Sequence, residues 1–420
     1  MQYLNGLLSF TSVMKSLGGV VLAIVILLVM VTIHEFGHYV AGKALGFKIN
    51  EFSVGFGPAL FKKRSKKTGE LFALRIIPLG GYCAFDGEDE VDDEPQKKAD
   101  DEPFEQFPDT TEENANDGGM VATNEPQEPK KDEYPEPKGE RFNDQAPWKR
   151  IIVLLAGATM NYILALFLII IMFTGFGRPL YQVVVENPNP PDMDAAAMAT
   201  IEEATNEYTG GLQTGDIILE IDGKNVYMIT DYMDILDGKK AGDSVPVKVI
   251  RDDEVQTVEM TLAINANFVN MSDTNTLLRS MNIYGLFTVT EKQGFFQTVG
   301  HSFAYSWKIG GTVLRSLGEL LTGKLGLDAM GGPVTTISVT AQAASSGLLS
   351  FLNIAAFIGV NLAVFNLLPV PALDGCKVIF CIIEWIRKKP VNRKVETMIH
   401  FIGIVFLFGF AILVDLLQLF

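Results

Sequence analysis

Cysteine and long basic stretches are scarce in this sequence. The chain of 420 residues holds three cysteines, Cys83, Cys376 and Cys381, whose spacing matches neither a zinc ribbon nor a disulfide framework. We therefore expect them to be buried thiols. The polar segment 178–297 has no cysteine and needs no oxidising compartment. The lack of a basic stripe excludes nucleic acid as a partner.

The acidic charge of the chain is confined to one segment. The formal net charge is −16, and the whole excess lies between Asp86 and Glu140. Proline, asparagine and glutamine fill much of this segment and aliphatic residues are nearly absent, which is the composition of a disordered chain. We therefore expect residues 86–140 to be an acidic disordered insertion that acts as a solvated linker.

Long apolar runs dominate the remainder, and 48% of all residues are hydrophobic. Four runs are long enough to cross a bilayer. We predict a polytopic α-helical membrane protein with four transmembrane helices, at residues 17–43, 150–174, 348–385 and 399–420. The third run is interrupted by two prolines and Asp374, and a membrane helix that stops in this way needs its freed backbone groups satisfied by protein or water.

Three further segments lie between these runs. Residues 47–85 contain two strand-like stretches separated by a basic turn, which predicts a membrane-associated β hairpin. Residues 181–292 contain an Asp-Gly turn and a later hairpin pattern around Asp252-Asp253-Glu254, which predict a small β-rich domain. Residues 295–345 are amphipathic and broken by glycine and proline, and we expect them to lie at the membrane interface.

The distribution of basic residues predicts the orientation. Lysine and arginine cluster at residues 62–67, 149–150 and 387–394. Such clusters mark cytoplasmic loops, so we place all three on the cytoplasmic side of the cell membrane. The β-rich domain is then extracytoplasmic, and the cytoplasmic end of the first span contains the motif considered next.

The cytoplasmic half of the first span contains His34-Glu35-Phe36-Gly37-His38. On a helix, His34 and His38 lie one turn apart on the same face, so both imidazoles can bind one zinc ion while Glu35 takes the proton of a water molecule. The chain has only four histidines, and chance would produce this motif in roughly one such sequence in several hundred. Ionisable groups inside a span are costly and are functional by default. We therefore predict a zinc site here.

A catalytic zinc usually has three protein ligands, which leaves one to be found. His301, His400 and Asp374 are available. Asp374 is favoured because the broken third span places it near the same leaflet as the two histidines; the alternative is that this aspartate only caps a helix. Asn366 or Asn161 could help to stabilise a developing oxyanion.

Together these motifs resemble the bacterial site-2 proteases of the regulator-of-sigma-E protease type. The resemblance covers nearly the whole chain and rests on four stretches: His34 to His38, Gly157-Ala158-Thr159-Met160-Asn161, the PDZ signature Gly-Leu-x-x-Gly-Asp at residues 211–216, and Asn366 to Gly375. Ala158 stands where the family usually has proline, and the acidic insertion is unusually long. Neither departure removes a side chain that would bind the metal or take part in catalysis.

The resemblance implies an intramembrane zinc metalloprotease with a PDZ-like domain. The implied Zn²⁺ ligands are His34, His38 and Asp374, with Glu35 as the catalytic residue. The implied substrate contacts are Asn366 and the hairpin around Gly80 and Gly81, to which we add Asn161.

The implied substrates are single-span proteins, such as anti-sigma factors or remnant signal peptides, already shortened by a site-1-type protease. Because a helix hides its peptide bonds, the substrate must become extended, and a strand edge can supply replacement hydrogen bonds. The PDZ-like domain would be a size filter or would bind a trimmed C-terminus, or it could be a passive spacer. The alternatives are a PDZ-containing scaffold and a metal transporter, although a transporter is expected to have repeated halves, which the sequence lacks.

Overall fold

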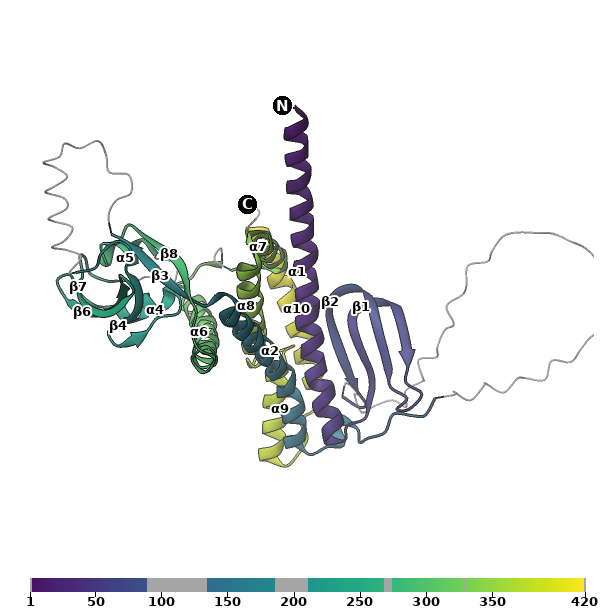
Figure 1. The fold of residues 1–420 in the computed structure, drawn as a ribbon. Coiled ribbons are helices and arrows are strands. Elements are labelled where there is room, and N and C mark those ends of the chain that lie inside the picture. Colours follow the sequence, from purple (N-terminus) through teal and green to yellow (C-terminus); the bar gives the residue numbers. More distant parts are fainter. Residues whose placement is uncertain (1, 89–133, 186–210, 268–273, 328–329, 419–420) are drawn as a thin grey trace, which may run out of the picture.

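The computed structural model describes residues 2–88, 134–185, 211–267, 274–327 and 330–418. Most of the predicted acidic insertion 86–140 lies outside these residues. Long helices form the middle of the molecule, with a small sheet on one side and a separate β-rich domain on the other (Figure 1).

Four of the described helices are long and apolar enough to cross a membrane, as the sequence predicted. They are residues 17–45 of α1 (Gln2–Leu45), α2 (Pro147–Phe176), α8 (Leu348–Asn366) and α10 (Arg393–Leu417). Between 11% and 39% of the residues in their most apolar stretches are buried inside the protein. The rest of this hydrocarbon surface is suited to contact with lipid.

The stretch 348–385, predicted as one interrupted span, forms two helices. The first, α8, ends at Asn366, and α9 (Asp374–Arg387) begins after a turn. Pro369 and Pro371 lie in this turn, and neither has the backbone N–H that a continuing helix requires. Of the two helices, only α8 has the length and hydropathy of a span.

The sheet beside α1 consists of β1 (Ile49–Arg64) and β2 (Leu71–Phe85), which are antiparallel. Both strands are bent, so Glu51 pairs with Leu71 on one side and with Ala84 on the other. The predicted hairpin is therefore folded into a sheet of four strand segments.

The bends in this sheet depend on glycine. Gly55 and Gly80 have φ of 85° and 95°, backbone conformations that residues with a Cβ rarely adopt. As a result, residues 81–85 pair with the first part of β1 and with no other strand in the described chain. The segment 81–85 is thus an outer edge of the sheet, and it lies next to α1.

The β-rich domain is one antiparallel sheet with the strand order β7-β6-β4-β3-β8. Its predicted turns are confirmed, because Ile221 pairs with Lys224 across Asp222-Gly223, and Arg251 pairs with Glu254 across Asp252-Asp253. The elements of the domain are β3 (Arg178–Val184), β4 (Ile217–Ile221), β5 (Lys224–Asn225), β6 (Ser244–Arg251), β7 (Glu254–Thr261), β8 (Gly285–Glu291), α4 (Ile229–Leu236) and α5 (Thr274–Ser280).

Two further helices, α6 (Phe295–Leu321) and α7 (Pro333–Ser346), connect this domain to α8, and a short helix η1 (Phe142–Asp144) precedes α2. One face of α6 packs against α2 and α8. The other face leaves Phe296 and Trp307 largely exposed, at 87% and 78% of their surface. The buried face of α6 carries several polar residues, among them Thr298, Ser302 and Glu319, so the helix is amphipathic, as predicted, with aromatic residues on its outer face. Its position at the membrane interface remains a prediction.

Candidate metal centre

Helices α1 and α2 approach each other closely at the histidine motif. A Cβ added to Gly37 would lie 2.4 Å from the carbonyl oxygen of Ala156, and one added to Gly157 would lie 2.3 Å from Nε2 of His38 and 2.8 Å from Cε1 of His34. Small residues allow membrane helices to pack at such short distances. Gly157 therefore forms a wall directly behind both imidazoles.

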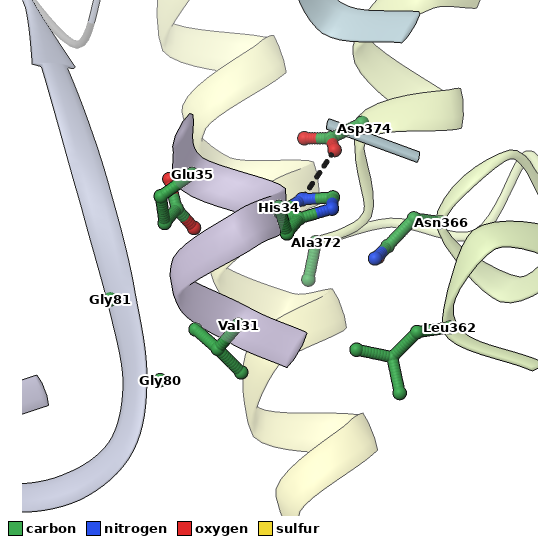
Figure 2. A pocket seen from close by; sticks show the side chains of 9 residues that line it. All are labelled: Val31, His34, Glu35, Gly80, Gly81, Leu362, Asn366, Ala372 and Asp374. Atoms are coloured by element: carbon green, nitrogen blue, oxygen red, sulfur yellow. Dashed lines mark ion pairs between the residues drawn. The ribbon is translucent and has the colours of Figure 1, made fainter. Parts of the chain in front are cut away.

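The two histidines meet Asp374 at the start of α9. Nε2 of His34 and Nε2 of His38 lie 3.1 Å and 3.3 Å from Oδ2 of Asp374, and the two nitrogens lie 3.2 Å apart. Figure 2 shows His34 and Asp374 pointing toward one another from different helices. Within the described ranges, these three residues form the one group of His, Cys, Asp or Glu side chains able to share a metal ion.

The outer nitrogens of both rings contact α2. Nδ1 of His38 lies 2.8 Å from the carbonyl oxygen of Val153, an acceptor, so Nδ1 carries the proton and Nε2 has a free lone pair. Nδ1 of His34 lies 3.4 Å from the side-chain amide of Asn161. The Oδ1 atom of that buried amide has no hydrogen-bond partner among the described residues, and rotation of the amide presents Oδ1 to the ring N–H.

This arrangement fits a divalent cation. Two imidazole lone pairs and one carboxylate oxygen converge on a single point, and they repel one another unless a positive charge lies between them. Two histidines and a carboxylate are one of the ligand sets of catalytic zinc. Hydrogen bonds to the outer nitrogens orient the rings of such ligands, as Val153 and Asn161 are placed to do here.

A strained turn holds Asp374 in place. Ala372 has a φ of 78°, which costs a residue other than glycine about 1–2 kcal/mol. Gly375 lies so close to the end of α8 that an added Cβ would be 2.4 Å from the carbonyl oxygens of Leu367 and Leu368. The first turn of α9 is therefore packed directly against the last turn of α8.

A cavity of about 260 Å³ opens beside this cluster. Glu35 lies between α1 and the edge of the sheet, where a Cβ added to Gly81 would be 3.2 Å from its Cγ. The cavity thus joins a carboxylate, a strand edge and the metal cluster in one space (Figure 2). Its lining residues are Val31, His34, Glu35, Gly80, Gly81, Leu362, Asn366, Ala372 and Asp374.

Comparison with known proteins identifies the family. The sequence model of peptidase family M50 matches residues 22–410, which include the entire cluster. The chain belongs to peptidase family M50. This M50 peptidase is 27% identical to the regulator of sigma-W protease RasP of Bacillus subtilis, over 92% of this chain and 95% of that protein. It is 26% identical to the zinc metalloprotease RasP of Bacillus licheniformis, over 90% of this chain and 93% of that protein.

The M50 peptidase is therefore an intramembrane zinc metalloprotease of the site-2 type and a multi-pass membrane protein. This replaces the alternatives of a scaffold and a metal transporter. The recognition of the family from sequence motifs is confirmed, as is the zinc cofactor.

Three of the candidates named from the sequence occupy other places in the M50 peptidase. Asn161 is fully buried behind His34 and does not line the cavity. Nδ1 of His301 lies 2.8 Å from the hydroxyl of Tyr227, and His301 does not belong to the metal cluster. Nδ1 of His400 accepts a hydrogen bond of 3.1 Å from the backbone N–H of Ala372, so His400 contacts the turn that carries Asp374 and is not itself in the cluster.

Sequence reasoning missed three features of this site. Gly157 belongs to one of the stretches that carry the family resemblance, but its close approach to the histidines depends on how α1 and α2 cross. Val31 and Leu362 line the cavity and have no polar group that would have marked them. For Val31, the spacing of three residues before His34 was an available signal, since it lies on the same helix face.

Proposed function

We propose that the M50 peptidase hydrolyses a peptide bond within or near the transmembrane segment of a single-span protein, with His34, His38 and Asp374 as zinc ligands and Glu35 as general base. The observation that carries this proposal is the shared cavity, in which Glu35 lies between the metal cluster and the strand edge at Gly81. A peptide extended along that edge would pass both the base and the metal.

Zinc, when bound, lowers the pKa of a water molecule to near neutrality and polarises the scissile carbonyl. Glu35 accepts the proton from the attacking water as its oxygen forms a bond to the carbonyl carbon. The same carboxyl group then returns the proton to the leaving nitrogen as the C–N bond breaks. The amide of Asn366, which lines the same cavity, is placed to donate a hydrogen bond to the carbonyl oxygen.

Substrate unwinding is assigned to the sheet. A transmembrane helix satisfies its own N–H and C=O groups, and in lipid it cannot give them up without a replacement. Among the described strands, residues 81–85 pair with β1 alone, so the other side of this segment is an open strand edge to which a substrate strand can add by β-augmentation. Glycine at positions 80 and 81 keeps this edge clear of side chains beside Glu35.

The substrate class follows from the membrane setting and the relatives. A relative that regulates sigma-W by proteolysis supports an anti-sigma-type membrane protein as substrate, and a remnant signal peptide has the same single-span form. We assign the β-rich domain, residues 181–292, as a PDZ-like module on the extracytoplasmic side. There it filters substrates by size, so that only proteins shortened by an upstream protease reach the cavity.

The catalytic role of Glu35 is tested by Glu35→Gln. This variant removes the base but keeps a side chain of the same size, so we expect normal zinc content and a loss of cleavage of about 10²–10⁴-fold. Glu254→Gln, an exposed change on β7, is the matched control and should cleave like the parent. The assay is cleavage of a tagged single-span protein by the purified enzyme in proteoliposomes. Parent-like activity of Glu35→Gln would refute the role of Glu35 as general base.

The third ligand is tested separately by Asp374→Asn. An amide binds zinc far more weakly than a carboxylate, so the variant should contain clearly less zinc by elemental analysis after dialysis. The Glu35→Gln protein is the matched comparison, because it should retain its zinc. Equal zinc content in both variants would show that the third ligand is a residue other than Asp374.

A further inference from the structure

Helix α10 contacts the turn that carries Asp374 at two neighbouring positions. Nδ1 of His400 accepts a hydrogen bond of 3.1 Å from the backbone N–H of Ala372. One turn later, Gly403 is so close to the same turn that an added Cβ would lie 2.4 Å from Cβ of Pro371. His400 and Gly403 are three residues apart and therefore lie on one face of α10.

These contacts stand out because α10 is otherwise poorly packed. Only Gly403 and Val414 are buried on this helix in the described chain. At its far end, Asp415 accepts hydrogen bonds from the backbone N–H groups of Val334 and Thr335 at the start of α7. The described part of α10 is thus held at its start by the ion pair of Arg393 with Glu384 of α9, at the Asp374 turn by His400, and at its far end by α7.

The turn needs an external support of this kind. Ala372 has a positive φ that residues other than glycine rarely adopt, and such a conformation persists only where its surroundings determine it. The hydrogen bond from the Ala372 N–H to His400 is one such determinant. The ring of His400 also packs edge-to-face against Phe380 of α9, with centroids 5.9 Å apart. His400 therefore connects the strained residue to the helix that begins with Asp374.

We propose that α10 positions the third zinc ligand, with His400 as a positioning residue that holds Ala372 in its left-handed conformation and Gly403 as the site of close approach to Pro371. This inference rests on the proposed role of Asp374 as a ligand. His400 is neither a member of the metal cluster nor among the residues that line the cavity. It acts through the backbone, by fixing the direction in which Asp374 leaves the turn.

The test separates the hydrogen bond from the packing of the ring. His400→Phe keeps an aromatic ring against Phe380 but removes the acceptor, whereas His400→Asn keeps an acceptor near the position of Nδ1. We expect His400→Phe to lower kcat about tenfold, as loss of an indirect support of a metal ligand commonly does, with KM unchanged. His400→Asn should restore most of the loss.

Two readouts do not depend on activity. In the cobalt-substituted enzyme, the visible absorption of the metal should change in His400→Phe and return toward the parent in His400→Asn. In the zinc-free enzyme, the peptide containing Ala372 should exchange its amide hydrogen faster in His400→Phe, because the N–H has lost its acceptor. Parent-like exchange and an unchanged cobalt spectrum in His400→Phe would overturn the proposal, as would a failure of His400→Asn to recover either.

A second pair of variants covers the case in which His400→Phe does not fold. Gly403→Ala adds a methyl group against Pro371 and should lower kcat and alter the cobalt spectrum in the same direction. Gly409→Ala, on the same helix, adds the same methyl group where no atom lies within 4 Å, and should behave like the parent. Equal effects of the two alanines would refute a specific role for the contact. If Asp374→Asn keeps its zinc while Ala372 still exchanges faster in His400→Phe, the ligand assignment has failed and the support of the turn has not.

Discussion

Gly157 leaves no room for a side chain beside the two imidazoles of the metal centre, and Gly157→Ala tests what this close approach controls. The added Cβ would lie 2.3 Å from Nε2 of His38 and 2.7 Å from its Cε1. An ordinary contact needs about 3.5 Å, so the ring or the helix must move by about 1 Å. Metal–ligand distances tolerate only about 0.2 Å. Moving α2 away instead would open the packing of Gly37 against Ala156.

We therefore expect Gly157→Ala to fold but to lose zinc affinity and to cleave about 10²-fold more slowly, the usual cost of a displacement of about 1 Å at a reacting centre. Zinc content by elemental analysis and cleavage of a single-span substrate in proteoliposomes are the measurements. Gly175→Ala is the control, since it lies on the same helix with no atom within 4 Å of the added Cβ. If Gly157→Ala binds zinc and cleaves like Gly175→Ala, the wall behind the histidines has no functional role.

Three other contacts support the site from a distance. Glu70 is buried and joins the start of β2 to the end of α1 by an ion pair with Lys43. Glu70→Gln should therefore destabilise the sheet by about 1.5–3 kcal/mol and slow cleavage without loss of zinc. Unchanged hydrogen exchange across residues 49–85 would contradict this. Glu384 pairs with the buried Arg150 and also with Arg393, so Glu384→Gln should cost about 3–5 kcal/mol, seen as a lower melting temperature. Replacing Arg150 and Glu384 by methionine should recover the part of this loss that comes from the buried Arg150. Burial alone would raise the pKa of Asp86, but hydrogen bonds from Lys48 and from the side-chain amide of Asn50 hold that pKa below its ordinary 3.8. The ion pair of Lys48 with Asp86 therefore stabilises the base of the sheet at every pH above that value, and this contribution is lost only as the pH falls through the lowered pKa. Protection of the amide hydrogens at the base of the sheet against exchange should thus be constant from about pH 5 to about pH 8.

The chemistry of the site was largely predictable because it depends on short spacings. His34 and His38 lie on one helix face by the geometry of the helix alone, and the interruption of the third span drew attention to Asp374. The broken third span already favoured Asp374 over His301 and His400, and the folded chain shows that Asp374 alone of the three meets His34 and His38. Their residue types alone do not separate these candidates, whereas their positions along the chain and in the fold do.

The supports of the site were not predictable because they depend on close approaches between distant segments. The contact of Gly157 with the imidazoles requires the crossing of α1 and α2, and the hydrogen bond of Ala372 to His400 requires α10 to reach the turn. The bends of the sheet could not be predicted from the sequence either. Two strand-like runs and a turn predicted a hairpin, whereas the bends at Gly55 and Gly80 that fold it into four segments follow from tertiary packing.

The separation of the proposed metal ligands along the chain has a consequence for how the enzyme is made. The two histidines lie in the first span and Asp374 lies after the third, so nearly the whole chain must be synthesised before all three can meet. At ordinary translation rates this interval is on the order of tens of seconds. During it, the nascent chain carries the base and two imidazoles but no complete metal site. With His34, His38 and Asp374 as the proposed ligands, we expect a newly inserted chain to be unable to cut neighbouring proteins until Asp374 has reached the two histidines, so that the order of synthesis protects the membrane during biogenesis.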